Sequence, residues 1–75
     1  MRNVYYNGQR IGTLLIHRNS GQVIFERIGS INYPLILRYI DISGEQQTID
    51  MFPSVQEIRF AGGQKLEITV SKSPN

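Results

Sequence analysis

Four short turn sequences constrain this chain more than any other feature. Each places a glycine directly before a Gln or Glu, between stretches rich in aliphatic and β-branched residues: Asn7-Gly8-Gln9, Ser20-Gly21-Gln22, Ser43-Gly44-Glu45 and Gly62-Gly63-Gln64. Asn-Gly, Ser-Gly and Gly-Gly pairs supply the positive φ angles that tight β-hairpin turns need. The pattern therefore predicts a series of short strands folded back on one another.

The segments between these turns predict the strands themselves. Residues 4–6, 10–17 and 22–28 are expected to form a three-stranded meander, followed by a hairpin of residues 35–42 and 46–51. A last hairpin is expected to join residues 58–60 and 66–70 across Gly62-Gly63. The connection 29–34 is not an obvious tight turn, so a corner or a change of sheet is expected there.

A helix competes with a strand at two places. Pro34 could occupy the first position of a helix over residues 35–42, but the three isoleucines of that segment are stiff at χ1 and favour a strand. Ser54 and Glu57 form a capping-box pattern, which leaves open one short helical turn near residues 54–58. The alternation of residues 58–60 favours a strand directly after it.

These features predict an all-β fold, either a small antiparallel barrel or a two-layer sandwich of six to seven short strands joined by hairpin turns. The chain has 75 residues and is expected to form a single β domain over residues 1–70, with a flexible polar tail at 71–75. Residues 1–8 lack the apolar run of a signal peptide, and no apolar stretch approaches the roughly 20 residues of a membrane span. We therefore expect a cytoplasmic protein that does not enter membranes.

The apolar residues are distributed unevenly among the strands. In the last strand, Leu66, Ile68 and Val70 alternate with polar residues, which is typical of a sheet with one solvated face. The second, third and fourth strands instead offer apolar side chains on both faces: Leu14 and Ile16 against Ile11 and Leu15, Val23 and Phe25 against Ile24 and Ile28, and Leu35, Leu37 and Tyr39 against Ile36, Ile40 and Ile42. A small domain must pack this surface irregularly or cover it with another chain.

Catalytic chemistry has little support in the composition. The chain has one histidine, His17, and no cysteine, and its six acidic residues are dispersed, so neither a metal site nor a cofactor is expected. Asp41 and Asp50 could face each other across a hairpin, but such carboxylates are more often solvated residues at strand ends. No catalytic residue is assigned, and the protein is not expected to be an enzyme.

The leading functional hypothesis is a small protein-interaction module that binds a partner protein or itself, through an apolar sheet face or a free strand edge. Tyr33, Arg38 and Tyr39 are the candidate partner-binding residues, because they add ring area or a guanidinium to the doubly apolar fourth strand. A homo-oligomer is one form that this interaction could take.

The alternative hypothesis is a small β-barrel that binds single-stranded nucleic acid through stacked rings and arginines. Its candidate residues are Tyr5, Tyr6, Arg10, Arg18 and Arg27. The formal net charge is only +2 and the basic residues are scattered, which makes this a weaker hypothesis than protein binding.

The segment Asn3 to Leu14 reads Asn-Val-Tyr-Tyr-Asn-Gly-Gln-Arg-Ile-Gly-Thr-Leu. It resembles the first hairpin of the small amino-terminal subdomain of HipA-type toxin kinases. The resemblance covers these twelve residues and implies a hairpin at this position. No function is transferred from it.

Overall fold

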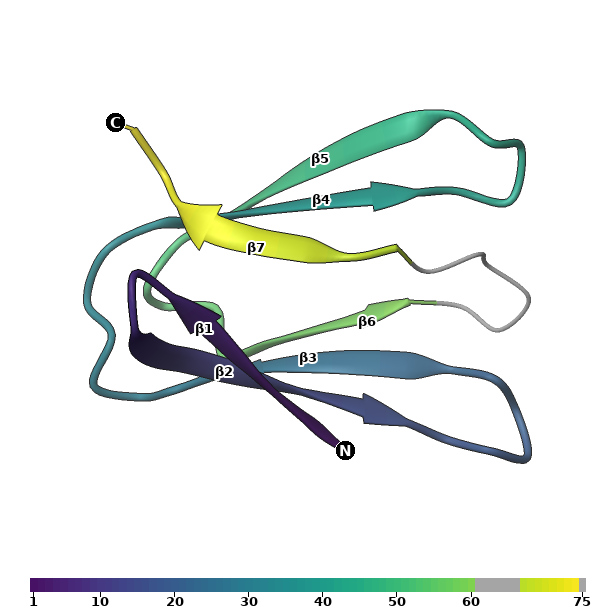
Figure 1. Cartoon of the computed structure of the whole chain (residues 1–75), viewed down its shortest axis with the longest axis horizontal. Helices are drawn as coiled ribbons and strands as arrows, with labels where there is room; N and C mark the ends of the chain where they lie inside the picture. Colours follow the sequence, from purple (N-terminus) through teal and green to yellow (C-terminus); the bar gives the residue numbers. More distant parts are fainter. Residues whose placement is uncertain (61–66, 75) are drawn as a thin grey trace.

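A computed structural model describes residues 1–60 and 67–74, which contain seven β-strands and no helix (Figure 1). The strands are β1 (Arg2–Tyr6), β2 (Gln9–Ile16), β3 (Val23–Arg27), β4 (Leu35–Ile40), β5 (Gln46–Met51), β6 (Glu57–Phe60) and β7 (Thr69–Lys72). The all-β prediction is confirmed, including a strand in the segment 35–42. The optional helical turn near 54–58 is not formed, because Ser54 lies in a turn and β6 begins three residues later.

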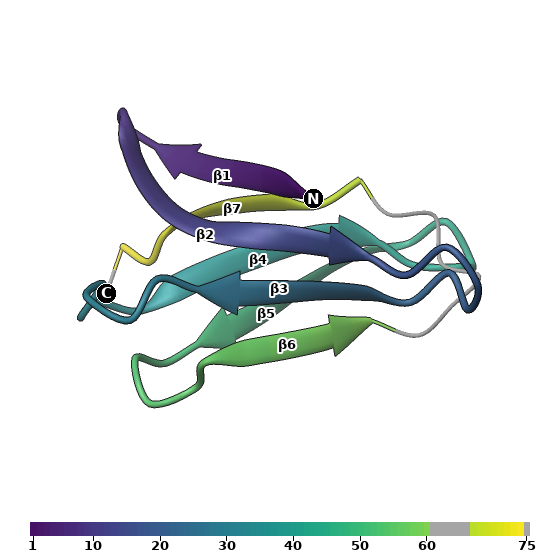
Figure 2. The same ribbon diagram turned by 90° about the horizontal axis from the view of Figure 1, so that it is seen from below.

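The strands form two antiparallel sheets that pack as two layers (Figures 1 and 2). The first sheet has the order β1-β2-β3-β6 and the second has the order β5-β4-β7. The connection 29–34 carries the chain from the first sheet to the second, as the sequence predicted, and the connection 52–56 carries it back. The chain thus changes sheet between successive groups of strands.

The predicted hairpin between the last two strands is wrong. β6 pairs with β3 in the first sheet, whereas β7 pairs with β4 in the second. Gly62 and Gly63, the expected turn residues, lie outside the described residues. Alternating side chains identify two strands and their buried faces, but they do not determine which neighbour each strand pairs with.

Three of the four predicted glycine turns lie in the described residues, and all three have the expected backbone. Asn7 and Gly8 have φ angles of 50° and 80° and join β1 to β2. Gly21 and Gly44 have φ angles of 72° and 90°, in the turns that follow β2 and β4. A side chain is strained at such angles, which explains why glycine stands at these positions.

The core lies between the two sheets and contains buried side chains from both. Phe25 of β3 and Leu35, Leu37 and Met51 of the second sheet are among the largest fully buried side chains. The ring of Tyr39 packs edge-on against Phe60 across the sheets, with 5.0 Å between ring centroids. The remaining buried members of this cluster are Ile11, Leu14, Val23, Ile31, Phe60, Ile68 and Val70.

A β-bulge in β2 shows that the predicted orientation of Ile11 is wrong. Val4 lies opposite Gly12, but the next residue, Tyr5, lies opposite Arg10, so that Ile11 is the extra residue on β2. Strict alternation had placed Ile11 on the face opposite Leu14. The bulge shifts the alternation by one residue, and both side chains join the core.

The doubly apolar character of β4 persists in the structure. Leu35 and Leu37 are buried in the core, while Ile36 and Ile40 alternate with them and are only half-buried. Ile42, just beyond the strand, is 76% exposed. The sandwich therefore covers one apolar face of this strand and leaves part of the other in contact with solvent.

The last strand extends into the segment 71–75, which the sequence predicted as a polar tail. β7 continues to Lys72, and the backbone N–H of Ser73 donates a hydrogen bond of 2.9 Å to the Pro34 carbonyl. Ser73 is itself buried. Polar composition predicted an end to the sheet at Val70, but Ser71 and Lys72 pair with β4 through backbone groups that are independent of side-chain polarity.

Candidate protein-interaction surface

The two long sides of the sandwich differ (Figure 2). On one side, β1 of the first sheet and β7 of the second pack against each other. On the other side, the edge strands are β6 and β5, and these two strands make no comparable contact in the described structure. We call the side formed by β5, β6 and their connection 52–56 the open side.

The hydrogen-bond pattern shows which backbone groups of β6 face its free edge. The N–H of Arg27 donates to the carbonyl of Gln56 over 2.8 Å, so these opposite residues form a hydrogen-bonded pair. Hydrogen-bonded and non-hydrogen-bonded pairs alternate along an antiparallel ladder. Ile58 consequently bonds toward β3, and the N–H and C=O groups of Glu57 and Arg59 point away from it.

Backbone groups of β5 also face a free edge. The N–H of Asp41 donates to the carbonyl of Glu45 over 2.9 Å, which makes this the first hydrogen-bonded pair of the β4–β5 hairpin. By alternation, the backbone groups of Gln46, Thr48 and Asp50 point away from β4. Both strands of the open side thus present backbone donors and acceptors that neither sheet pairs.

Side chains on the open side combine a polar outer row with apolar residues beneath it. On β6, Glu57 and Arg59 are exposed on the outer face and form an ion pair of 3.2 Å between Oε2 and Nε. Ile58 of β6 and Ile49 of β5 are half-buried and pack against the core. The two edge strands therefore have polar side chains on their outer face and apolar side chains that contact the core on their inner face.

The connection between β5 and β6 adds two exposed apolar side chains. Phe52 is 60% exposed and Val55 is 38% exposed. The N–H of Val55 donates to the carbonyl of Phe52 over 2.9 Å, and Nε2 of Gln56 donates to the Pro53 carbonyl over 3.1 Å. These bonds fold residues 52–56 into a compact turn that presents both apolar groups at one end of the open side.

Arg27 holds this turn from the interior, although only 6% of its surface is exposed. Its Nη2 donates to the Met51 carbonyl over 2.6 Å and its Nε donates to the Val55 carbonyl over 3.1 Å. Its Nη1 donates to the carbonyls of Ile31 and Tyr33 over 3.2 and 3.0 Å. One guanidinium therefore ties together both described connections that change sheets.

Burial of this guanidinium costs solvation, and desolvation lowers the pKa of Arg27 from its ordinary value. The four carbonyl acceptors replace the lost water, because each is aligned with an N–H of the fork. Sequence reasoning had placed Arg27 in a nucleic-acid surface. The structure places it inside, where its donors are directed to backbone carbonyls.

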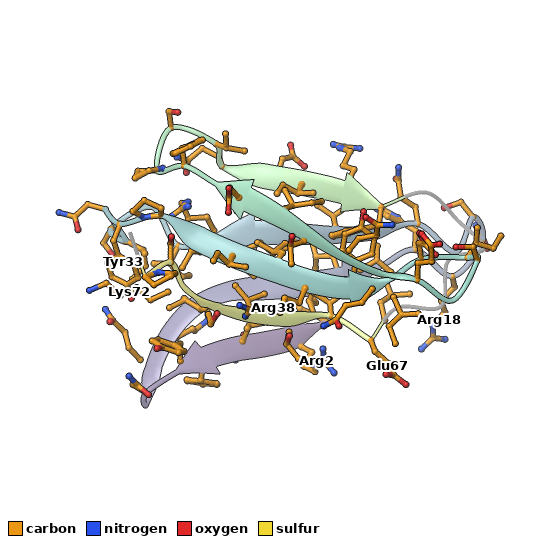
Figure 3. All side chains as sticks on the ribbon, turned by 90° about the horizontal axis from the view of Figure 1, so that it is seen from above. Arg2, Arg18, Tyr33, Arg38, Glu67 and Lys72 are labelled. Atoms are coloured by element: carbon orange, nitrogen blue, oxygen red, sulfur yellow. The ribbon has the colours of Figure 1, made fainter. Side chains whose placement is uncertain are left out.

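The three predicted partner-binding residues do not share one surface (Figure 3). Arg38 lies on the outer face of β4, where Nη1 donates to Oγ of Ser71 over 3.3 Å. Tyr39 points inward onto Phe60. Tyr33 lies at one end of the molecule in the connection 29–34, with Nζ of Lys72 4.7 Å from its ring centroid.

The nucleic-acid candidates are also dispersed. Tyr5 and Arg10 are opposite each other at the end of the β1–β2 hairpin, where Nη2 of Arg10 donates to Oγ1 of Thr13 over 2.7 Å. Tyr6 is half-buried against the core. Arg18 lies in the β2–β3 turn at the other end of the molecule, and Arg27 is buried. Tyr5 and Arg10 are the only two of the five that meet on exposed surface.

One surface cavity of the described structure is small. It has a volume of about 150 Å³ and is lined by residues of β4, β5 and the β7 region: Arg38, Tyr39, Ile40, Gln46, Glu67 and Thr69. Pockets that enclose small-molecule ligands usually measure about 300–1,000 Å³. Within residues 1–60 and 67–74, no three His, Asp or Glu side chains gather as a metal site would require, and no helix could cross a membrane.

The sequence does not predict the open side as a binding surface. Phe52 lies just outside the predicted strand 46–51, and Ile49 and Ile58 lie within predicted strands. A recognisable signal was the Phe52-Pro53 pair, an aromatic residue followed by a proline that ends a strand. No protein-family model, curated protein or solved structure matches the chain.

Proposed function

We propose that this domain is a non-catalytic, cytoplasmic protein-interaction module that binds through the strand edges of its open side. One observation carries the proposal: β5 and β6 lie on the same side of the sandwich, and neither edge is covered within the described structure. Unpaired strand edges bind extended segments of other chains by adding a strand to the sheet.

The exposed side chains beside these edges support the same function. Protein interfaces combine an apolar centre, often aromatic, with a polar rim. Phe52 and Val55 supply exposed apolar area next to edges that carry Thr48, Asp50 and Glu57. A bound strand would gain main-chain hydrogen bonds from the edge and apolar contact from the turn.

Edge-blocking prolines test the proposal. The N–H groups of Thr48 and Arg59 face the free edges, so Thr48→Pro and Arg59→Pro remove edge donors without removing a ladder bond. We expect the wild-type chain to form a complex with itself or with a protein captured from a cell extract, and the Thr48→Pro/Arg59→Pro variant to lose it. The complex is measured by analytical ultracentrifugation and by affinity capture with mass spectrometry.

Arg18→Ala serves as the control, because Arg18 is exposed in a turn away from the open side. This variant should bind as the wild type does, and circular dichroism should show that all variants are folded. A folded proline variant that keeps the complex would contradict binding through strand edges. A wild-type chain that forms no complex in either measurement would contradict the proposed function as a whole.

A further inference from the structure

Building on the proposed function, we infer that the occupant of the β6 edge is a second copy of this chain. The two β6 strands pair antiparallel about a two-fold axis that passes beside Ile58. The strand reads Glu57-Ile58-Arg59-Phe60, and this register makes its charge pattern complementary to itself. The pairing would join the two four-stranded sheets into one continuous sheet.

The backbone geometry of β6 suits this register. With Ile58 opposite Ile58 of the second copy, Glu57 of each chain lies opposite Arg59 of the other. Glu57 and Arg59 are the residues whose N–H and C=O groups face the free edge, so each such pair exchanges two backbone hydrogen bonds. The two Ile58 residues then form the non-hydrogen-bonded pair at the axis, where side chains of opposite strands approach most closely.

Charge complementarity identifies the second copy as the partner. The exposed Glu57 and Arg59 side chains point to the same outer face and already form an ion pair within one strand. In the dimer, each Glu57 would also face Arg59 of the second copy, so four charges of alternating sign would line the junction. An isologous contact repeats every favourable pair by symmetry.

The register of β6 on β3 leaves Glu57 in an unfavourable position within one chain. Glu57 lies directly opposite Glu26 of β3, and both side chains are exposed. Like charges opposite each other on antiparallel strands are destabilising. An arginine from the second copy would stand on the other side of Glu57 and offset this repulsion.

The other edge of the open side lacks this feature. If two β5 strands paired about Thr48, Gln46 of each chain would lie opposite Asp50 of the other, which brings no opposite charges together. β6 is therefore the edge that selects a copy of itself. It is also a short strand, and standard interfaces bury about 800 Å² per partner, so the dimer is expected to be weak and concentration-dependent.

Charge reversal gives a specific test of this register. In Glu57→Arg, the introduced arginine of each chain would face Arg59 of the second copy. In Arg59→Glu, the introduced glutamate of each chain would face Glu57 of the second copy. Each variant alone should dimerise about tenfold or more weakly than the wild type, because two attractive pairs become repulsive. When the two variants are mixed, every facing pair is again of opposite sign, and a heterodimer should form.

The measurement is sedimentation equilibrium over a wide range of protein concentration, on each variant alone and on the equimolar mixture with one variant fluorescently labelled. Arg18→Glu provides the control, since it makes the same charge change as Arg59→Glu at an exposed site away from β6. Recovery of dimer only in the mixture supports the inference, whereas a general change of net charge cannot produce it.

Two results would overturn the inference. A wild-type chain that stays monomeric at all concentrations excludes the dimer, and reversal variants that dimerise as strongly as the wild type place the contact elsewhere. The proposed function is judged separately. If the monomeric chain still captures a protein that the edge-blocking prolines release, the function stands and only the identity of the occupant is wrong.

Discussion

The two long sides of the sandwich differ in how their edge strands are held in place. On the β1/β7 side, which we call the closed side, the edge strand of each sheet contacts the edge strand of the other. On the open side, β5 and β6 are linked by the turn 52–56, and this turn is fixed by Arg27 rather than by strand contact. On this side a buried guanidinium, and not contact between edge strands, holds the turn, and the edges of β5 and β6 stay accessible.

Because of this difference, the residues that stabilise the open side are not the residues that are exposed for binding. Val4 and Tyr6 of β1 pack against the core and make the closed side part of the folded interior. On the open side, the groups that fix the turn are backbone carbonyls bound from inside, so the side chains of Phe52 and Val55 are free to face solvent. Residues that hold the open side and residues that can bind a partner are therefore different residues.

The largest effect is expected from removing the interior support of the open side. Arg27→Met keeps much of the side-chain volume but leaves the carbonyls of Ile31, Tyr33, Met51 and Val55 without the guanidinium. Each buried polar group left unsatisfied costs about 1–3 kcal/mol, so the free energy of unfolding should fall by about 3 kcal/mol or more. Urea denaturation measures this loss.

Arg38→Met is the matched control for that substitution. Arg38 is exposed on β4, where its guanidinium donates to the hydroxyl of Ser71, so its replacement should change stability by about 0.5 kcal/mol or less. Hydrogen exchange should show that residues 51–56 lose protection first in Arg27→Met. Equal effects of the two substitutions would show that Arg27 does not fix the open side.

A smaller effect is expected on the closed side from Gly12→Ala. Gly12 lies between Val4 of β1 and Arg27 of β3, and a Cβ added there would overlap the ring of Phe25 and the carbonyl oxygen of Glu26. Overpacking of this kind typically costs about 1–3 kcal/mol. The cost should appear as a lower urea midpoint, because neither the β2–β3 backbone nor the buried ring can move away freely.

Gly29→Ala is the control for Gly12→Ala. A Cβ at Gly29 would meet no atom within 4 Å, and its φ is not in the left-handed region, so the substitution should be neutral or slightly stabilising. If Gly12→Ala were tolerated as well as Gly29→Ala, the Phe25 ring and the Glu26 carbonyl would not pack as closely against Gly12 as the structure indicates.

The sequence predicted strands better than their arrangement. Glycine turns and β-branched segments located β1 to β5 because hairpin geometry depends on residues that are neighbours in the chain. The pairing of β6 with β3 depends on residues more than thirty positions apart, and no local pattern specifies it. The bulge at Ile11 is similarly hidden, because one extra residue reverses the alternation without leaving a distinct sequence signal.

The candidate site was harder to predict for a related reason. From the sequence, Arg27 is predicted only as a surface residue that could bind nucleic acid, because its carbonyl partners come from two connections that only the fold brings together. In the sequence, Glu57 is part of a capping-box pattern and Arg59 belongs to a predicted strand, and neither observation indicates a binding edge. They become informative only when β6 is known to be an edge, because an edge position determines which backbone groups remain unpaired.

The smallest effect concerns the turn that positions β5 on the open side. The carboxylate of Asp41 accepts bonds from Oγ of Ser43 over 2.6 Å and Nε2 of Gln47 over 2.9 Å, and from the N–H groups of Ser43 and Glu45. The side-chain bonds from Ser43 and Gln47 are the main cause that lowers the pKa of Asp41. A carboxyl whose folded pKa is below its unfolded value of about 3.9 stabilises the protein at neutral pH and loses this contribution as acid protonates the folded state.

Asp41→Ala should therefore lower Tm slightly at pH 7, and the difference from wild type should shrink below about pH 4. Asp50→Ala removes the same charge from the same hairpin without breaking these turn bonds, so thermal unfolding of both variants at about pH 7 and about pH 2.5 separates the turn from net charge. A Tm difference for Asp41→Ala that stays constant down to the lower pH would mean that the ionised carboxylate does not stabilise the turn.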